Sequence, residues 1–518
     1  MEHIIIRGGT VIDGTGCPGR RADIEVHDGI ITAIGDLRGR GADIMLDADG
    51  LVVAPGFIDA HAHSDTAFLQ DDSCASKLYQ GVTTEISGNC GFCPFPAREE
   101  QTEADPWQCT SFAAFLERFR TGGHCMAVNQ AMLVGHGALR TCVVGAEGRT
   151  ATDEELAHMA QLLRRDLDTG AWGLSLGLEY APGCFADRRE LNALAAVVRS
   201  CDGILTCHMR NEGLHIDDAM CELLDAGRAS GAHVHISHLK LDHYRAHGRA
   251  PMVWGTIKDA RRTGVCVTAD AYPYTASCTT LTIRCPKWSL DGGNEALLKH
   301  LAGARRREVV EGIRKHYFDA ERAQTCLISD DGGLWPEIVG KTLRSVAEKL
   351  LGTTDYAEAA AQVLQRTRAE ASCIFFVMDE RDMLYFLSKD VCIGSDSAAM
   401  SGDPTRVTGM PHPRAYGAIA EFFRIARKKR LCSLEEAVRR VTAGTAACFG
   451  MVDRGRLCEG MAADITVFDP SAIGPRATYL APVRLAAGVR HVLVNGVIAL
   501  RDGIQTDLRA GRFLLKGR

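Results

Sequence analysis

The sequence has no uninterrupted hydrophobic run of roughly 18 or more residues, the length at which a helix can span a membrane, so we expect no membrane span. It also lacks an excess of basic residues. Its 59 lysines and arginines stand against 65 aspartates and glutamates, and the formal net charge of −6 argues against nucleic acid as a partner. The first residues contain no charged segment followed by an apolar core, which predicts a soluble, cytoplasmic protein without a secretory signal.

Cysteine, in contrast, is abundant. The chain contains 20 cysteines, and without an export signal they predict reduced thiols rather than a disulfide framework. No internal repeat or low-complexity tract interrupts the sequence. A chain of 518 residues is too long for one small domain, so we expect one large domain accompanied by a smaller one.

The two ends of the chain carry the same pattern of short β-type runs. Residues 4–6 and 30–34 are such runs, and glycine-containing turn signals separate the runs of the first fifty residues. Similar runs return at residues 463–468 and 491–498. We therefore expect residues 1–54 and 455–518 to meet and build one small β domain, a β-sandwich.

Residues 55–454 have a different sequence pattern, in which short apolar runs alternate with stretches that read as helices. This alternation predicts a parallel α/β architecture, and the length suits a (β/α)8 TIM-like barrel. A polar, charged stretch at about residues 285–346 breaks the rhythm, and we interpret it as an insertion or lid. In such a barrel the reactive residues lie at the carboxyl ends of the strands, so we expect catalytic and metal-binding side chains there.

The first strand end carries two histidines. His61 and His63 follow the apolar run at residues 51–55, and strand alternation places them on one face together with Asp59. Two imidazoles at this spacing can reach one metal ion. Two histidines with ordinary hydrogen-bond partners near a surface would give the same pattern, since the motif is short.

The next strand end carries a cysteine. Residues 82–87 read as a strand, and the turn after it contains Cys90 between Asn89 and Gly91. A thiolate is a strong zinc ligand. The alternatives are a small buried core thiol, or redox or zinc-knuckle chemistry with Cys93.

Two middle strands also end in histidine. His208 ends the strand at residues 204–208, and His238 ends the next one. By strand alternation Lys240 shares a face with His238, whereas His233 and His235 fall on the other face, where we expect ordinary half-exposed residues.

Two later strand ends offer acid–base groups. Tyr272 follows the strand at residues 265–270, and a phenol there could stabilise developing negative charge or could simply pack. Asp396 follows an apolar run and a glycine. Such an aspartate is often a turn residue, but beside a metal it is suited to act as the base for a water. His136 follows another apolar run, and we expect it near the mouth, behind the reacting groups.

The order of these residues resembles the amidohydrolase superfamily. Five segments are similar to its N-acyl-D-amino-acid deacylase (D-aminoacylase) branch: residues 88–91, 208–212, 236–240, 272–274 and 411–414. The segments at residues 56–59 and 459–464 match as well, so the resemblance spans nearly the whole chain.

The resemblance implies a function and a site. It implies zinc-dependent hydrolysis of the amide bond of small N-acyl-D-amino acids, with Asp396 as base and then acid. One tight zinc site would consist of Cys90, His208 and His238, and a second, weaker or vacant site of His61, His63 and Asp396. The implied substrate contacts are Lys240 and Arg414 for the α-carboxylate and Tyr272 for the oxyanion.

Alternatives to this function remain open. The enzyme could act on another linear or cyclic amide, such as a dipeptide containing a D-residue or a hydantoin-like ring. The fold could also serve as a non-catalytic scaffold, which would be marked by lost metal ligands. Leu239 departs from the branch, where a histidine is common. The loop at residues 397–410 is longer than in compact members, so the sequence does not fix the substrate's side chain or acyl group. It does not fix the oligomeric state either.

Overall fold

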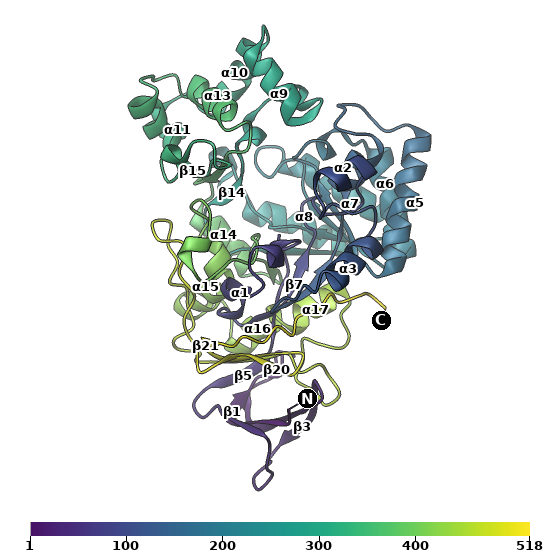
Figure 1. Ribbon diagram of the computed structural model, residues 1–518, viewed down its shortest axis with the longest axis vertical. Coiled ribbons are helices and arrows are strands. Elements are labelled where there is room, and N and C mark those ends of the chain that lie inside the picture. The colour runs from purple at the N-terminus through teal and green to yellow at the C-terminus, as the bar shows by residue number, and fades with distance from the viewer. Residues whose placement is uncertain (1, 518) are drawn as a thin grey trace.

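The computed structural model describes residues 2–517. The molecule is elongated, with strands from the chain termini at one end, a layer of strands and helices in the middle, and a separate group of helices at the other end (Figure 1). No helix within residues 2–517 is long and apolar enough to cross a bilayer.

Strands from both ends of the chain pair in one nine-stranded sheet. Its path runs β21-β20-β19-β18-β5-β1-β2-β3, and β4 pairs with β1. The strands are β1 (Ile4–Val11), β2 (Arg20–His27), β3 (Ile30–Gly35), β4 (Ile44–Asp47), β5 (Val52–Pro55), β18 (Ile465–Phe468), β19 (Val489–Val494), β20 (Val497–Arg501) and β21 (Ile504–Gln505). The junction is the antiparallel pairing of β18 with β5, which joins the two termini of the chain.

Two parallel sheets make up the middle of the molecule. One is ordered β6-β7-β8 and the other β17-β13-β12-β11-β10-β9. The strands are β6 (Phe57–Asp59), β7 (Val82–Ser87), β8 (Asn129–Met132), β9 (Val134–Gly135), β10 (Gly173–Gly177), β11 (Ile204–His208), β12 (His233–Ile236), β13 (Val267–Ala271) and β17 (Cys392–Ile393). These sheets and their helices confirm the α/β class expected from the sequence.

The two parallel sheets are connected at both edges. Only Leu133 separates β8 from β9 along the chain. At the other edge the Ala60 N–H donates to the Ile393 carbonyl at 3.1 Å, and the Asp396 N–H donates to the His61 carbonyl at 2.8 Å. The carboxyl ends of β6 and β17 therefore lie side by side.

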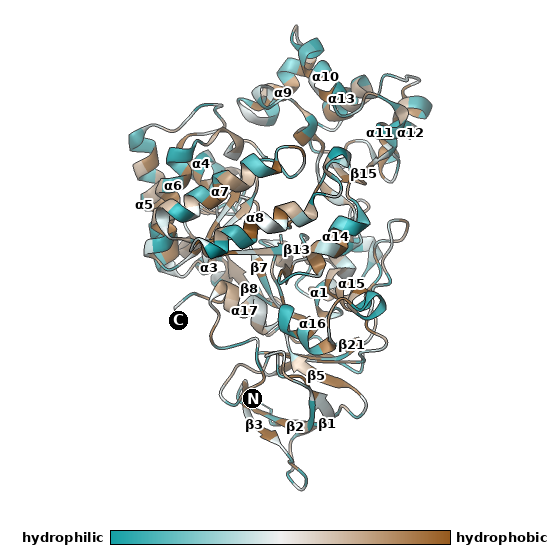
Figure 2. Ribbon diagram, turned by 180° about the vertical axis from the view of Figure 1, so that it is seen from behind, coloured by the Kyte–Doolittle hydropathy of each residue, from teal (hydrophilic) through white to brown (hydrophobic). Residues whose placement is uncertain are grey.

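Helices surround these sheets. They are α1 (Ala75–Leu78), α2 (Glu99–Ala104), α3 (Phe112–Thr121), α4 (His136–Val143), α5 (Asp153–Thr169), α6 (Arg188–Ser200), α7 (Ile216–Ser230), α8 (Ala250–Arg262), α14 (Glu380–Leu387), α15 (Arg414–Lys429), α16 (Leu434–Arg440) and α17 (Ala443–Phe449). Figure 2 shows hydrophilic and hydrophobic positions alternating along α8, whose buried residues Val253, Ile257 and Ala260 recur every three or four positions. Helix α5 begins at a capping box of Thr152 and Glu155 and ends at Gly170, in a left-handed conformation with φ of 119°.

A separate subdomain lies between β13 and β17 along the chain. It contains the antiparallel sheet β14 (Ser277–Thr280), β16 (Ser372–Phe375) and β15 (Cys326–Asp330), with helices α9 (Gly293–Ala302), α10 (Arg306–Arg314), α11 (Ala320–Gln324), α12 (Leu343–Ser345) and α13 (Tyr356–Arg366). Its own hydrophobic cluster runs from Leu281 to Phe375. This span contains the segment interpreted as an insertion and extends beyond it at its carboxyl side.

A buried ion pair links the terminal sheet to the parallel sheets. Asp464, just before β18, pairs with Arg454 and accepts hydrogen bonds from Asn129 Nδ2 at 3.2 Å and the Asn495 backbone N–H at 2.6 Å. Asp464 and Arg454 are only 4% and 3% exposed. Removing one member of such a pair leaves an uncompensated buried charge.

We therefore expect Asp464→Asn to lower the free energy of unfolding by about 3–5 kcal/mol in urea denaturation. The matched control is Asp453→Asn, because Asp453 pairs with the same arginine at 2.9 Å but its side chain is 58% exposed. The control should cost less than about 1 kcal/mol. Equal losses in the two variants would contradict the role given to the buried pair.

Candidate metal centre

The carboxyl ends of the parallel strands bring the predicted ligands together. His61 and His63 follow β6, Cys90 follows β7, and His208 ends β11. His238 follows β12 and Asp396 follows β17. All of these strands run in the same direction, so their carboxyl ends share one face of the molecule.

Four donor atoms form the centre of this cluster. The ligand atoms of His61, Cys90, His238 and Asp396 all lie within 4.8 Å of one another. The Cys90 Sγ is 3.3 Å from His61 Nε2 and 3.3 Å from His238 Nε2. His63 joins through its Nε2, which is 3.1 Å from Asp396 Oδ1.

His208 lies at the edge of the same cluster. It belongs to a second group, with Glu212 and His238, whose ligand atoms are within 4.8 Å of one another. Its Nε2 is 3.0 Å from Glu179 Oε2, and its Nδ1 is buried without a hydrogen-bond partner. The structure thus gathers all six predicted ligands, and their division into a tight and a weaker site stays a prediction.

Three of these residues have an unusual backbone. Cys90, His238 and Asp396 have φ angles of 55°, 37° and 51°, in the left-handed region that residues with a Cβ rarely adopt. Such conformations cost free energy and persist where the surrounding structure enforces them, often at functional sites. At each of these three positions the chain changes direction after a strand, and the ligand side chain lies toward the other ligands.

The cluster fits a divalent metal ion. Burial and the nearby Asp396 carboxylate raise the pKa of the Cys90 thiol well above its usual range, so without a cation the thiol stays protonated. Burial and the neighbouring Lys240 ammonium hold the pKa of His238 well below its usual range, and burial also lowers the pKa of His63. The imidazoles of His63 and His238 are therefore neutral. A buried thiol, imidazoles and a carboxylate are the donor set that suits zinc.

A buried aspartate behind the ligands was missed in the sequence. Asp270, fully buried near the end of β13, lies 3.3 Å from His61 Nδ1 and 2.9 Å from His235 Nε2, and accepts a hydrogen bond from the His238 backbone N–H at 2.8 Å. Although burial opposes ionisation, the charge of His61 holds the pKa of Asp270 below its usual value. Its only sequence signal was a carboxylate near a strand end.

Glu212 is the second residue that the sequence gave no role. It is 2% exposed, and its Oε1 lies 3.0 Å from His238 Nδ1 while it pairs with Lys240 through Oε2. Outer partners of this kind fix the orientation of metal-binding histidines. Glu212 belongs to the segment at residues 208–212 that is similar to the deacylase branch, but the local sequence pattern does not indicate where its side chain points.

Two predictions about histidines were wrong. His235 is not half-exposed but 1% exposed, because the chain turns after β12 and both His235 and His238 contact Asp270. His136 is fully buried at the start of α4 and lies 2.7 Å from Glu190, so it faces an ion pair rather than the mouth. His233 is half-buried, as expected, and contacts Thr268.

The predicted substrate residues surround Asp396. Arg414 Nη1 lies 2.8 Å from Asp396 Oδ2, and the Arg414 Nε is buried without a hydrogen-bond partner. The Tyr272 ring stands between the cations, with centroid distances of 4.9 Å to the Arg414 guanidinium and 5.9 Å to Lys240 Nζ. Although burial opposes ionisation, Arg414 holds the pKa of Asp396 well below its usual range, so Asp396 is a carboxylate at neutral pH.

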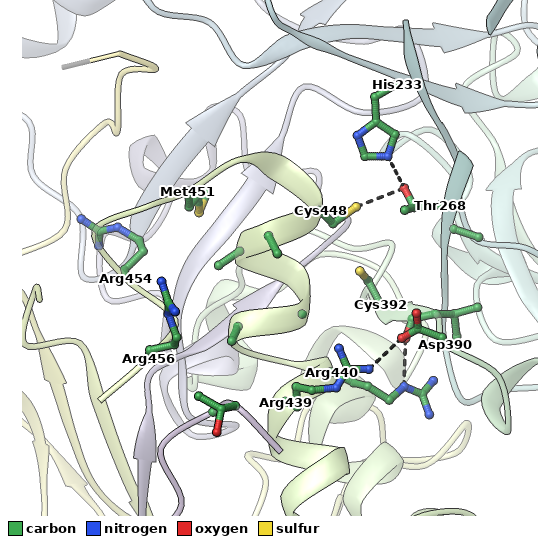
Figure 3. Close-up of a pocket in the computed structure, with 18 of the residues that line it drawn as sticks. His233, Thr268, Asp390, Cys392, Arg439, Arg440, Cys448, Met451, Arg454 and Arg456 are labelled. Carbon is green, nitrogen blue, oxygen red and sulfur yellow. Dashed lines mark hydrogen bonds and ion pairs between the residues drawn. The ribbon is translucent and has the colours of Figure 1, made fainter. Parts of the chain in front are cut away.

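A cavity of about 270 Å³ opens onto the metal centre, and its lining includes His63, Cys90, His208, Lys240 and Arg414. A larger cavity, of about 680 Å³, lies elsewhere, against α17 and the starts of β13 and β17. Arginines and the Cys448 thiol line it (Figure 3). None of the six predicted ligands lines this larger cavity, so we assign the chemistry to the smaller one.

Comparison with known proteins agrees with this geometry. The sequence profile of the amidohydrolase family matches residues 45–285 and 388–500. The chain belongs to the amidohydrolase family. The gap between the two matched ranges, residues 286–387, includes most of the subdomain between β13 and β17.

Individual relatives narrow the family to a branch. An N-acyl-D-glutamate deacylase and an N-acyl-D-aspartate deacylase from Alcaligenes xylosoxydans xylosoxydans are 34% and 35% identical to this chain, over 99% and 100% of it and 96% of each relative. The crystal structure of the N-acyl-D-glutamate deacylase from Bordetella bronchiseptica, complexed with zinc and a phosphonate mimic of the tetrahedral intermediate, is 33% identical over 99% of both chains, with a TM-score of 0.85. The expected resemblance to the N-acyl-D-amino-acid deacylase branch is confirmed.

Asp270 is predicted to support the metal ligands. Asp270→Asn replaces an acceptor shared by His61, His235 and the His238 backbone with an amide that cannot accept all three bonds. We expect metal affinity to fall by about 10- to 100-fold, measured as the metal-to-protein ratio after dialysis against graded chelator. The control is Asp382→Asn, a buried carboxylate that accepts from Gly248 and Ala250 far from the ligands. If both variants retain metal like the unaltered protein, Asp270 does not support the site.

Proposed function

We propose that this amidohydrolase hydrolyses the amide bond of N-acyl-D-amino acids, releasing a carboxylate and a free D-amino acid. The proposal rests on one observation. The ligand atoms of Cys90, His61, His238 and Asp396 lie within 4.8 Å of one another, and a cationic wall formed by Lys240 and Arg414 lies beside them. The chain is a metal-dependent amide hydrolase of the D-aminoacylase type, and its relatives in this branch are named for N-acyl-D-amino acids.

We also infer the finer architecture from the contacts between the sheets. The backbone bonds between β6 and β17, with the near-continuity of β8 and β9, support closure of the parallel strands into a (β/α)8 barrel. The pairing of β18 with β5 supports a division into a β domain of residues 1–54 and 455–518 and a catalytic domain of residues 55–454.

We propose that zinc binds among the six ligands. Cys90, His208 and His238 would hold the tight ion, and the orphaned Nδ1 of His208 supplies a free donor for it. His61, His63 and Asp396 would hold a second, weaker ion. When bound, zinc lowers the pKa of a water to about 7 and polarises the amide carbonyl.

Asp396 acts as general base and then as general acid. Its carboxylate stays ionised at neutral pH beside Arg414, and its Oδ1 faces His61 and His63 at 3.6 Å and 3.1 Å. A group in this position can accept the proton of the attacking water and then deliver it to the amine that leaves. The amine needs this proton because an amide anion is a poor leaving group.

The cationic wall orients the substrate. Lys240 and Arg414 both line the cavity, and the unpaired Nε–H of Arg414 offers a donor to an α-carboxylate. Burial raises the pKa of Tyr272, so its hydroxyl keeps its proton and can donate to the carbonyl oxygen as that oxygen gains charge. Hydrolysis of another linear or cyclic amide, such as a dipeptide containing a D-residue or a hydantoin-like ring, is the alternative, because it needs the same metal centre.

A substrate panel tests the activity. The protein loaded with zinc should hydrolyse at least one N-acetyl-D-amino acid at least about 100-fold faster, in kcat/KM, than its L-enantiomer, measured by release of the free amine. A hydantoin and a dipeptide containing a D-residue complete the panel. Faster turnover of either one, or of L-substrates, would refute the proposed substrate class.

Two variants test the assigned roles. Cys90→Ala should lose the tight zinc in elemental analysis, because the remaining imidazoles lack the thiolate charge. Asp396→Asn should keep the tight zinc yet lose about 10²- to 10⁴-fold in kcat. Asp403→Asn, in the exposed part of the loop after Asp396, is the control and should match the unaltered enzyme. Zinc retained by Cys90→Ala, or full turnover by Asp396→Asn, contradicts the assignment.

A further inference from the structure

A second chamber adjoins the metal centre. It has a volume of about 490 Å³ and shares Cys90, Phe92 and Tyr180 with the 270 Å³ cavity described above. The rings of Phe92 and Tyr180 lie 5.3 Å apart, between centroids, where the two cavities meet. Cys90 therefore borders both cavities.

The two cavities share some lining segments and differ in others. Segments that follow β6, β7 and β10 line both, and the smaller cavity is also lined by segments that follow β11, β12, β13 and β17, including Lys240 and Arg414. The second chamber is lined by segments that follow β6, β7, β9 and β10, including Thr66, Pro94, Ala138 and Pro182. Of the six predicted metal ligands, Cys90 lines both cavities, whereas His63, His208 and Asp396 line the smaller one.

This division assigns the halves of the substrate. An N-acyl amino acid has its scissile carbonyl in the middle, with the α-carboxylate on one side and the acyl chain on the other. Both cations suited to the carboxylate line the smaller cavity and neither lines the second chamber, so with the carboxylate at these cations the acyl chain can point toward the second chamber.

We propose that this chamber is an acyl-binding subsite, and that the enzyme prefers a neutral, apolar acyl group much larger than acetyl, such as phenylacetyl. The inference rests on the proposed deacylase function. A cavity of 490 Å³ falls in the size range of sites for drug-sized ligands, whereas an acetyl methyl would leave most of it to water.

The lining explains the preference. Trp107, Phe92, Leu69 and several prolines and glycines supply apolar and aromatic surface. None of the described residues that line the chamber is a lysine or arginine, whereas Asp65 and Asp105 do line it. An acyl group that carries its own carboxylate, such as succinyl, would meet these acids without a cation and should bind poorly.

The experiment compares acyl groups on one D-amino acid that the enzyme accepts. The value of kcat/KM should rise at least about tenfold from N-acetyl to N-phenylacetyl and should fall for N-succinyl. Ala138→Phe, which places a ring in the chamber from α4, should lower the phenylacetyl-to-acetyl ratio at least about tenfold. Ala229→Phe, at an exposed position of α7, is the matched control and should keep the ratio of the unaltered enzyme.

A binding measurement separates this inference from the proposed function. By calorimetry, phenylacetate should bind the zinc-loaded protein at least about tenfold more tightly than acetate, and Ala138→Phe should remove the difference, whether or not any amide is hydrolysed. If D-substrates are hydrolysed but acetyl is preferred and the two acids bind equally, the subsite is refuted while the deacylase function stands. If no N-acyl-D-amino acid is hydrolysed, the function fails, and the binding result alone decides the chamber.

Discussion

The structure depends on a set of buried donor atoms that cannot satisfy one another. Cys90 Sγ stands 3.3 Å from two imidazole nitrogens, and the Asp396 carboxylate lies in the same group. A protonated thiol makes only weak bonds to imidazoles, and a buried thiolate without a cation would be costly. A bound metal ion resolves this conflict, because it stabilises the thiolate and uses the imidazole lone pairs at once.

The scaffold pays for this arrangement in backbone strain and buried charge. Three ligands have positive φ, and two of them are fixed by their backbone N–H groups: that of Asp396 donates to the His61 carbonyl and that of His238 to the Asp270 carboxylate. Asp270 contributes most, since one carboxylate contacts two histidines and the backbone of a third. Strand ends that are fixed from behind can present ligands without relying on mobile loops.

Much of the site could be predicted from the sequence, because it follows from strand ends. His61, His63, Cys90, His208, His238 and Asp396 each stand directly after an apolar run, and parallel strands bring such positions together. His235 was misjudged because strand alternation was extended past Ile236, where β12 ends and the chain turns at His238 with φ of 37°. Asp270 and Glu212 could not be assigned, since their roles depend on which neighbouring strand lies beside them.

Part of the cavity wall lies outside the segments that follow the parallel strands. The relatives named for D-glutamate and for D-aspartate are 34% and 35% identical to this chain, so overall identity does not separate their substrates. The predicted ligands occupy the carboxyl ends of the strands, whereas Cys278 and Ser372, which line the same cavity, belong to the subdomain between β13 and β17. Because the family profile leaves most of that subdomain unmatched, its residues can change without disturbing the ligands. Differences in side-chain preference within this branch should therefore map to the wall formed by β14 and β16, and the metal centre should stay the same.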